Sequence, residues 1–409
     1  MSTIAMPSPP SRAFQSSVIK TTRIESIDVL RGTVMIIMAI DHVRDFFHGS
    51  AFFYSPTDLS HTSVILFFTR WITHYCAPIF VFLAGISAYL YGVKHGKREL
   101  SFFLLTRGIW LMLAEMFIIT LFQTFNPAYP GFNLQVIWAI GLCMAILSAL
   151  IYLDKRLIAI AAILLIAGHN LLDTVHVPGS GLSSFVWALL HDPGNFTFGH
   201  LTFRVIYPVL PWIGIIALGY CFGSLFTTDC VPEKRKRTLL WLGLITIILF
   251  AILRIGNFYG DAAHWSAQKN VAFGLLSFLN VTKYPPSLLY ILMTLGPALI
   301  FLAFAEKPLN IITSKIAVFG RVPMFYYLVH IFLIHLLALI GAMLSGYKWS
   351  AMILHTRVNA SIELKGYGFN LLTVYAVWMT VIVILYPLCK WFDRYKRVNH
   401  AKHWWLSYL

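Results

Sequence analysis

The ionisable residues that could do chemistry are concentrated near the end of the first apolar run, Ile27–Phe47, where residues Asp41–Asp45 read Asp-His-Val-Arg-Asp. Ionisable groups at membrane depth are costly unless they are paired or face water, so they are candidates for function. His42 is the best candidate for a general base, because imidazole titrates near neutral pH. Asp41 and Asp45 could tune it, and Asp45 lies one helical turn away. The alternative is a structural polar knot that caps this helix.

A second polar group opens the next apolar run, at Arg70 and His74. These two residues are four apart, so in a regular helix they share one face. Pro78 leaves a backbone carbonyl one turn earlier without its usual donor, which allows a kink beside them. We expect His74 either to act in catalysis or substrate orientation, or to be a packed, hydrogen-bonded histidine. Together with Arg70, the residues Arg44 and His61 are candidates for binding the substrate.

The composition identifies the solvent in which these residues must work. The 409 residues are 58% hydrophobic and only 11% charged, whereas a soluble domain carries roughly 25% charged residues. Lipid is therefore the expected surrounding. The formal charge of +15 does not indicate nucleic-acid binding, because the basic residues lie between the apolar runs, where they orient a membrane protein. The five cysteines form no C-x-x-C pair, so no disulfide framework is expected.

We predict an all-α polytopic membrane protein, with about ten transmembrane helices in one bundle and both termini cytoplasmic. Each helix needs about 20 apolar residues to cross the hydrocarbon. The predicted runs are Ile27–Phe47, Val64–Tyr91, Phe103–Phe122, Leu134–Leu153, Leu157–Leu172, Val205–Phe226, Leu239–Ile255, Ser287–Phe304, Ile316–Leu344 and Leu371–Trp391. The ninth run is long enough to tilt or break near Gly341. The segment Val271–Leu279 is left open as an eleventh span or a re-entrant piece.

The positions of the basic residues predict the orientation. Most of the 31 Lys and Arg residues fall on one side of the ten-run arrangement, which marks that side as cytoplasmic. The predicted domains are a disordered cytoplasmic tail at residues 1–22, a transmembrane domain at 23–395 and a basic, aromatic cytoplasmic tail at 396–409. The long polar loops Asp173–Phe203 and Asn257–Pro286 then face outward, and function is expected on that face or just beneath it.

Other chemistries lack their sequence patterns. The histidines have no H-E-x-x-H or comparable spacing, so no metal site is expected. The chain also has no G-x-G-x-x-G loop, no P-loop and no G-x-S-x-G elbow. ATP-driven transport and serine-hydrolase chemistry are therefore disfavoured.

Three stretches carry a resemblance to a known family. Ser26–Gly32, which leads into Asp41 and His42, is followed by Ala77–Gly85 (Ala-Pro-Ile-Phe-Val-Phe-Leu-Ala-Gly) and later by Gly320–His330. Together they resemble the transmembrane acyltransferases, in particular the bacterial relatives of heparan-α-glucosaminide N-acetyltransferase. The resemblance implies a helical bundle in the bacterial inner membrane, which takes an acetyl or other acyl group from cytosolic acyl-CoA. It delivers the group to an amine or hydroxyl of a sugar or glycan on the far side through a histidine in the membrane region.

The resemblance also implies where the donor, acetyl-CoA, binds. Its phosphates need cations, and Arg31 and Arg107 are on the expected cytoplasmic side. The related lysosomal enzyme carries its histidine in the segment after the first span, so His42, His61 and His74 all remain candidates for the base. The expected partners are acyl-CoA, a sugar or glycan acceptor and the lipid bilayer, with a homodimer left open. The alternative function is a transporter or flippase for a lipid-linked or small polar solute.

Overall fold

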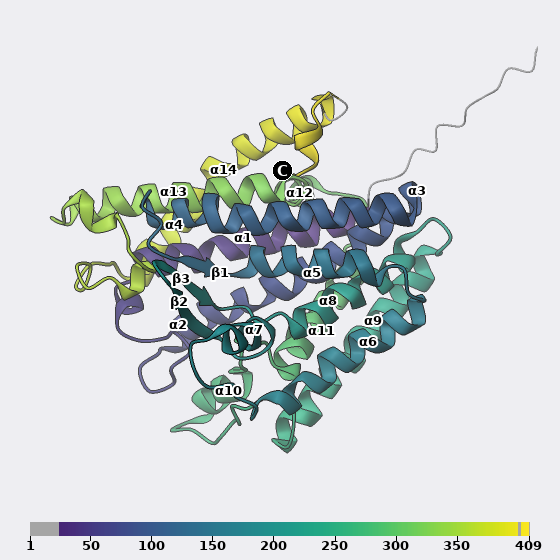
Figure 1. Ribbon diagram of the computed structural model, residues 1–409, viewed down its shortest axis with the longest axis horizontal. Helices are drawn as coiled ribbons and strands as arrows, with labels where there is room; N and C mark the ends of the chain where they lie inside the picture. The colour runs from purple at the N-terminus through teal and green to yellow at the C-terminus, as the bar shows by residue number, and fades with distance from the viewer. Residues whose placement is uncertain (1–23, 400–401, 409) are drawn as a thin grey trace, which may run out of the picture.

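Apolar helices make up most of the computed structural model, which describes residues 24–399 and 402–408 (Figure 1). The predicted tail at residues 1–22 lies outside these residues. The helices are α1 (Glu25–Phe47), α2 (Val64–Trp71), α3 (Cys76–Leu113), α4 (Thr120–Thr124), α5 (Val136–Leu150), α6 (Lys155–Gly168), α7 (Leu182–Leu190), α8 (Leu210–Phe222), α9 (Pro232–Gly256), α10 (Val271–Leu279), α11 (Leu288–Phe304), α12 (Ile311–Arg321), α13 (Pro323–Leu344) and α14 (Leu371–Asn399). The strands are β1 (Phe132–Leu134), β2 (Gly194–Phe198) and β3 (Leu201–Val205).

The lengths of the helices confirm a helical membrane protein. Five helical runs among the described residues are long and apolar enough to cross a membrane, judged by length and composition, and three shorter apolar helices accompany them. The five runs are Val64–Thr124, Lys155–Leu172, Pro232–Gly256, Pro323–Leu344 and Leu371–Asn399. The shorter ones are Val136–Leu150, Leu210–Phe226 and Leu288–Phe304.

The longest of these runs is a helical hairpin. Gly96, inside α3, has φ 79°, a left-handed conformation that glycine adopts without strain. The rings of Tyr91 and Phe103 are stacked with centroids 4.3 Å apart, although twelve residues of straight helix would separate them by roughly 18 Å. The chain therefore doubles back at Gly96. This confirms that the second and third apolar runs of the sequence are separate helices.

The second half of the hairpin contains a π-helical turn, Ala114–Ile119, which includes a buried acid. Glu115 is only 1% exposed, and its carboxylate accepts hydrogen bonds from the backbone N–H groups of Ile137 (3.0 Å) and Trp138 (3.3 Å). These donors belong to the first turn of α5, where N–H groups have no partner within the helix. Glu115 thus fixes the start of α5 against the hairpin.

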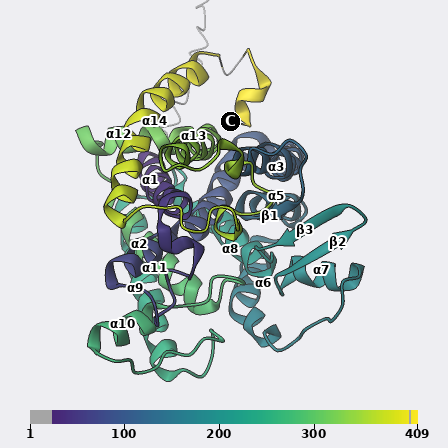
Figure 2. The same cartoon turned by 90° about the vertical axis from the view of Figure 1, so that its left-hand side faces the viewer.

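A small sheet departs from the all-α prediction. Its strand order is β1-β3-β2, with β1 parallel and β2 antiparallel to β3. The register pairs Asn133 with Arg204 and Asn195 with Arg204. Figure 2 shows β2, β3 and α7 on the side of the molecule opposite α10. The sheet attaches the long loop after α6 to the segment that precedes α5.

The ninth predicted run is two helices, not one. The helix breaks at Val322, whose φ of −130° and ψ of 53° are not helical, and Pro323 starts α13. Proline favours the first turn, where its missing N–H leaves no bond unmade. The chain continues as helix through Gly341, so of the tilt or break considered there, the break was wrong. In α12, a Cβ on Gly320 would lie 2.0 Å from the Asp28 carbonyl oxygen, and this close approach allows α12 to cross α1.

The segment left open as an eleventh span forms the short helix α10. Its nine residues extend roughly 13 Å, which is too short to cross about 30 Å of hydrocarbon. Phe273 and Leu276 of α10 pack with Phe67 of α2 in a separate apolar cluster. The segment therefore buttresses α2.

Charged residues gather where α1 begins. Arg31 lies 3.7 Å from Asp28, one helical turn away, and Arg321 lies 3.9 Å from Asp28 and 3.5 Å from Asp393. This network joins the start of α1, the end of α12 and the C-terminal part of α14. In the described segment 402–408, the Tyr408 hydroxyl donates a hydrogen bond to Thr106 on α3.

Candidate functional site

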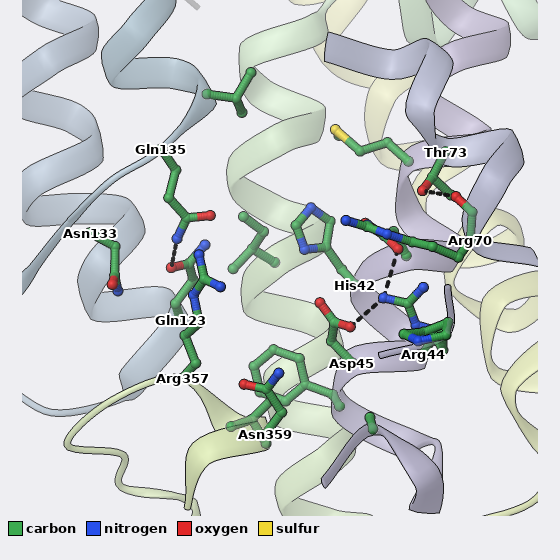
Figure 3. Close-up of a pocket in the computed structure, with 18 of the residues that line it drawn as sticks. His42, Arg44, Asp45, Arg70, Thr73, Gln123, Asn133, Gln135, Arg357 and Asn359 are labelled. Atoms are coloured by element: carbon green, nitrogen blue, oxygen red, sulfur yellow. Dashed lines mark hydrogen bonds and ion pairs between the residues drawn. The ribbon is translucent and has the colours of Figure 1, made fainter. Parts of the chain in front are cut away.

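A cavity of about 510 Å³ lies at the end of the bundle where α1 ends, and His42 lines it (Figure 3). We call it the histidine cavity. Its walls come from α1, α2, the hairpin, the segment before α5, α13 and four further connecting segments. Its charged and amide-bearing residues are Asp41, His42, Arg44, Asp45, Arg70, Gln123, Asn133, Gln135, Lys283, Arg357 and Asn359. The structure therefore brings together four of the sequence candidates that were close in the chain, and adds Arg70 to them.

Ion pairs hold the acids of this cavity. Arg44 lies 2.9 Å from Asp41 and 2.5 Å from Asp45, while Arg70 also pairs with Asp41. Neither carboxylate hydrogen-bonds to His42 within the described residues. The two acids thus fix the arginines, which sequence reasoning had assigned to substrate binding.

His42 faces the cavity and touches aromatic rings of α13 on its other side. The ring centroids of His42 and His330 are 5.1 Å apart, and those of His42 and Tyr327 are 6.4 Å apart. His330 is fully buried, and its Nδ1 lies 3.1 Å from the Tyr326 carbonyl oxygen. Since a carbonyl only accepts, Nδ1 carries the proton and Nε2 is an acceptor. That Nε2 has no hydrogen-bond partner within the described part of the chain.

The wall facing the ion pairs is lined by amides that sequence reasoning missed. Gln135 donates a hydrogen bond of 3.1 Å to Gln123, and Asn133 lies beside them in Figure 3. Arg357 and Asn359, from the segment between α13 and α14, line the same cavity. Gln123 follows the third apolar run and Gln135 is the second residue of the fourth, so a search of the polar residues at run ends could have found them.

Arg70 and His74 do not share a face. Between them, Ile72–Tyr75 form a 3₁₀ helix, in which residues three apart are aligned. Arg70, Thr73 and Cys76 accordingly line the cavity, whereas His74 is 3% exposed and does not. The expectation of a common face was wrong because it assumed a regular α-helix.

The backbone carbonyl of His74, rather than its side chain, has a structural role beside Pro78. Its carbonyl lies one turn before Pro78 and accepts a 2.7 Å hydrogen bond from the hydroxyl of Tyr290 on α11. The carbonyl that proline leaves without a donor is therefore satisfied by another helix.

His61 lies outside the cavity on an exposed segment. Its side chain is 61% exposed, and its Nδ1 lies 2.7 Å from Asp58. Of the three histidines that the sequence left open as the base, His42 alone lines the histidine cavity.

A second cavity, of about 370 Å³, lies toward the end of the bundle where α1 begins. We call it the apolar cavity, because its walls are mainly aliphatic, aromatic and methionine side chains from α1, α3, α5 and α13. Its cations are Arg31, Arg107, Arg321 and Lys396. Arg107 lies over the Phe103 ring at 5.7 Å, and Arg31 donates to Ser87 at 3.0 Å.

The two cavities share part of their walls. Four residues line both: Met38, Phe80, Val136 and Tyr327. On α1, the steps from Arg31 through Met35 and Met38 to His42 are four, three and four residues, so these side chains lie on one helix face. One face of α1 therefore runs from the cations of the apolar cavity to the imidazole of the histidine cavity.

The fold and these cavities define an integral membrane protein of apolar helices, with an internal polar site beside a hydrophobic chamber. Residues 23–255 match the family model described as heparan-alpha-glucosaminide N-acetyltransferase, catalytic. The match covers more than half of the chain, and the protein belongs to this family of membrane acetyltransferases. No curated protein matches the chain. The matched residues include His42 and Arg70, whereas Lys283, Tyr327 and Arg357 come from later in the chain.

Proposed function

We propose that this protein transfers an acetyl group from acetyl-CoA on the cytoplasmic side to an amine or hydroxyl of a sugar or glycan on the opposite side. The observation that carries the proposal is the shared wall of the two cavities. A donor entering the apolar cavity reaches the residues around Met38 and Tyr327 from one side. An acceptor entering the histidine cavity reaches the same residues from the other.

The apolar cavity suits the donor. Its rim cations, which include Arg31 and Arg107, supply charge for the CoA phosphates, and guanidinium groups bind phosphate well. Its hydrophobic interior suits the uncharged arm that carries the thioester. Lys396 and Arg321 of the same cavity extend the cationic rim beyond the sequence candidates.

His42 is the proposed base. The acceptor oxygen or nitrogen attacks the thioester carbonyl carbon and passes its proton to the imidazole. The carbon–sulfur bond then breaks, and the CoA sulfur leaves as the thiol after taking that proton. This direct transfer needs no covalent enzyme intermediate. A two-step route through an acetyl-histidine would release the same products.

His330 is the proposed positioning residue for this base, in place of the carboxylates suggested by the sequence. Asp41 and Asp45 are held by arginines, whereas His330 presents an acceptor nitrogen next to the His42 ring. Accepting a hydrogen bond from His42 would set its tautomer and stabilise the imidazolium that forms.

We also propose that the chain crosses the membrane ten times, with both ends of the described chain in the cytoplasm. The spans are α1, the two arms of the hairpin, α5, α6, α8, α9, α11, α13 and α14. Reporter fusions after Lys97, Arg237 and Lys402 should then report the cytoplasm, and fusions near Ser180 and Lys269 the opposite side. A reporter on the wrong side would contradict the ten-span arrangement and change the faces from which donor and acceptor are proposed to enter.

The decisive experiment uses the protein purified in detergent and then reconstituted in vesicles. Acetyl-CoA labelled in the acetyl group is supplied with candidate sugars, and both free CoA and labelled sugar are measured. In vesicles with a single protein orientation, transfer should require donor and acceptor on opposite sides. Sugar that crosses the membrane unlabelled, without CoA release, would favour the transporter alternative and overturn the proposal.

A further inference from the structure

The charge of the histidine cavity bears on its acceptor, and the inference rests on the proposed function. Four cations line the cavity, namely Arg44, Arg70, Lys283 and Arg357, against the two acids Asp41 and Asp45. Two positive charges are therefore left over. A concave site with one excess sign concentrates ligands of the opposite charge.

The excess comes from two particular residues. Asp41 and Asp45 are paired with Arg44 and Arg70 on α1 and α2, as described above. Lys283 and Arg357 form no ion pair with a carboxylate within residues 24–399 and 402–408. Lys283 immediately precedes α11, and Arg357 lies between α13 and α14. The uncompensated positive charge thus comes from two connecting segments that line the cavity.

The pKa of a nearby phenol, Tyr284, also reflects the excess positive charge of the cavity. Tyr284 also lines the cavity. Burial raises the pKa of its hydroxyl, but the positive charges of Lys283 and Arg70 outweigh burial and lower that pKa to about 8. Arg357 contributes in the same direction. An anion is therefore favoured at this place.

The remaining polar groups suit a saccharide. The side-chain amides of Gln123, Asn133, Gln135 and Asn359 both donate and accept hydrogen bonds, as sugar hydroxyls do. The ring of Tyr207 supplies an apolar surface on the same cavity wall.

We propose that the acceptor is an acidic saccharide, held through its carboxylate or other anionic group by Lys283 and Arg357 and acetylated on a hydroxyl. A protonated amino sugar would bring a third uncompensated positive charge into the cavity and would have to lose a proton before attack. A hydroxyl is neutral and needs only the base. This acceptor differs from the glucosaminide amine that the family's description denotes.

The bond changes are those of ester formation. The acceptor hydroxyl oxygen forms a bond to the acetyl carbonyl carbon, its proton passes to His42, and the thioester carbon–sulfur bond breaks. CoA leaves as the thiol with that proton, so the products are an acetate ester and CoA.

The test uses three matched acceptors with saturating acetyl-CoA: methyl glucuronide, its uncharged methyl ester, and methyl glucosaminide. We expect the glucuronide to have the highest kcat/KM, at least tenfold above its methyl ester. The product should release its acetyl group with hydroxylamine, as an ester does and an amide does not.

Substitutions then connect the preference to the two cations. Lys283→Gln and Arg357→Gln should each reduce the preference for glucuronide over its methyl ester by about tenfold. Lys269→Gln, on the exposed loop before α10, is the matched control and should leave the preference unchanged. The double variant Lys283→Glu/Arg357→Glu should favour the glucosaminide.

The outcomes separate this inference from the proposed function. CoA release with glucosaminide as the best acceptor and a hydroxylamine-stable product would overturn the inference and leave the acetyltransferase standing. An unchanged preference in both Gln variants would also overturn it. Transfer to none of the three acceptors, by a protein that acetylates another sugar, would overturn this inference alone, whereas no CoA release with any sugar would overturn the proposed function.

Discussion

The two cavities differ in the elements that form them. The apolar cavity is enclosed by the faces of α1, α3, α5 and α13, and most of its lining is hydrophobic. The histidine cavity draws its charged groups from helix ends and connecting segments, such as those that carry Lys283 and Arg357. A long hydrophobic passage can be built by helix packing alone, whereas a polar site needs several segments that converge at one end of the bundle.

A single helix joins these different regions. From Arg31 to His42, α1 rises roughly 16 Å, and its cavity face changes from cationic through methionine to imidazole. If the two regions act as a donor site and an acceptor site, substitutions in each should impair different steps of the transfer.

The largest effect is expected at His42. The change His42→Ala removes the proposed base and should lower kcat by about 10²–10⁴-fold while acetyl-CoA binding persists. His61→Ala, on the exposed segment, is the control and should retain activity. Free CoA release by the purified variants measures the effect. Full activity in a folded His42→Ala protein would assign the base elsewhere.

The connection between the cavities comes next. Met38→Trp enlarges a side chain that lines both cavities and should lower transfer by about 10²-fold, because small displacements of reacting groups have effects of this size. Ile109→Trp, at an exposed position of α3, should have little effect. Donor binding, measured by calorimetry, should survive in both variants. Normal transfer by Met38→Trp would place the reaction path elsewhere.

The donor side is tested by its cations. Arg107→Glu should raise the KM for acetyl-CoA by roughly 10- to 100-fold, since hydrogen bonds to charged groups contribute about 1.5–3 kcal/mol. Arg31→Glu should act in the same direction, although it also removes the contact with Ser87. Lys97→Glu, on the exposed turn of the hairpin, is the control. Unchanged affinity for acetyl-CoA in a folded Arg31→Glu/Arg107→Glu protein would show that the CoA phosphates bind elsewhere.

His330 should have a smaller effect, through His42. His330→Phe removes the acceptor nitrogen and should lower kcat by about tenfold, the equivalent of one hydrogen bond, with little change in either KM. The pH at which activity is half-maximal should also shift, because the partner of the imidazolium is lost. Restoration of that pH by His330→Gln, whose amide can accept, would separate positioning from packing. A pH profile identical to that of the unaltered protein would contradict the role.

The smallest effect concerns Tyr284. With its pKa lowered to about 8, the phenol is neutral below that pH and anionic above it. The phenolate cancels one positive charge, so the KM for an acidic acceptor should rise about two- to fivefold as the pH passes through 8. Tyr284→Phe should abolish this rise. The ratio of glucuronide to methyl ester KM across pH measures it, and an unchanged rise in the variant would assign it to another group.

Much of the helix pattern could be predicted because hydrophobic length is a local property. The first run was expected at Ile27–Phe47 and is Glu25–Phe47, and the last begins at Leu371 as expected. The errors occur where local backbone geometry, not hydrophobicity, determines the secondary structure. Three- and five-residue strands carry too weak a pattern to be recognised, and Pro323 ends one helix and begins another within a continuous apolar run.

The candidate site was predicted where its charged residues stand inside an apolar run, as Arg70 does in the second run. Asp41, His42, Arg44 and Asp45 were found because charges within an apolar run are conspicuous. Gln123, Lys283 and Arg357 lie in three separate segments, and each by itself has the appearance of an ordinary polar residue at the end of a helix. His74 was overestimated because a 3₁₀ turn, which the sequence pattern does not reveal, rotates it away from the cavity.

Hydrophobicity along the chain is enough to establish that this protein is built of apolar helices and that a histidine lies among charges late in the first of them. This is a local property, because each polar group exposed to lipid without a partner is costly on its own. Packing of the helices determines which polar residues meet and with what net charge. Pairing of Asp41 and Asp45 with arginines leaves Lys283 and Arg357 as the uncompensated charges, and such pairing depends on distances between segments that only packing brings together.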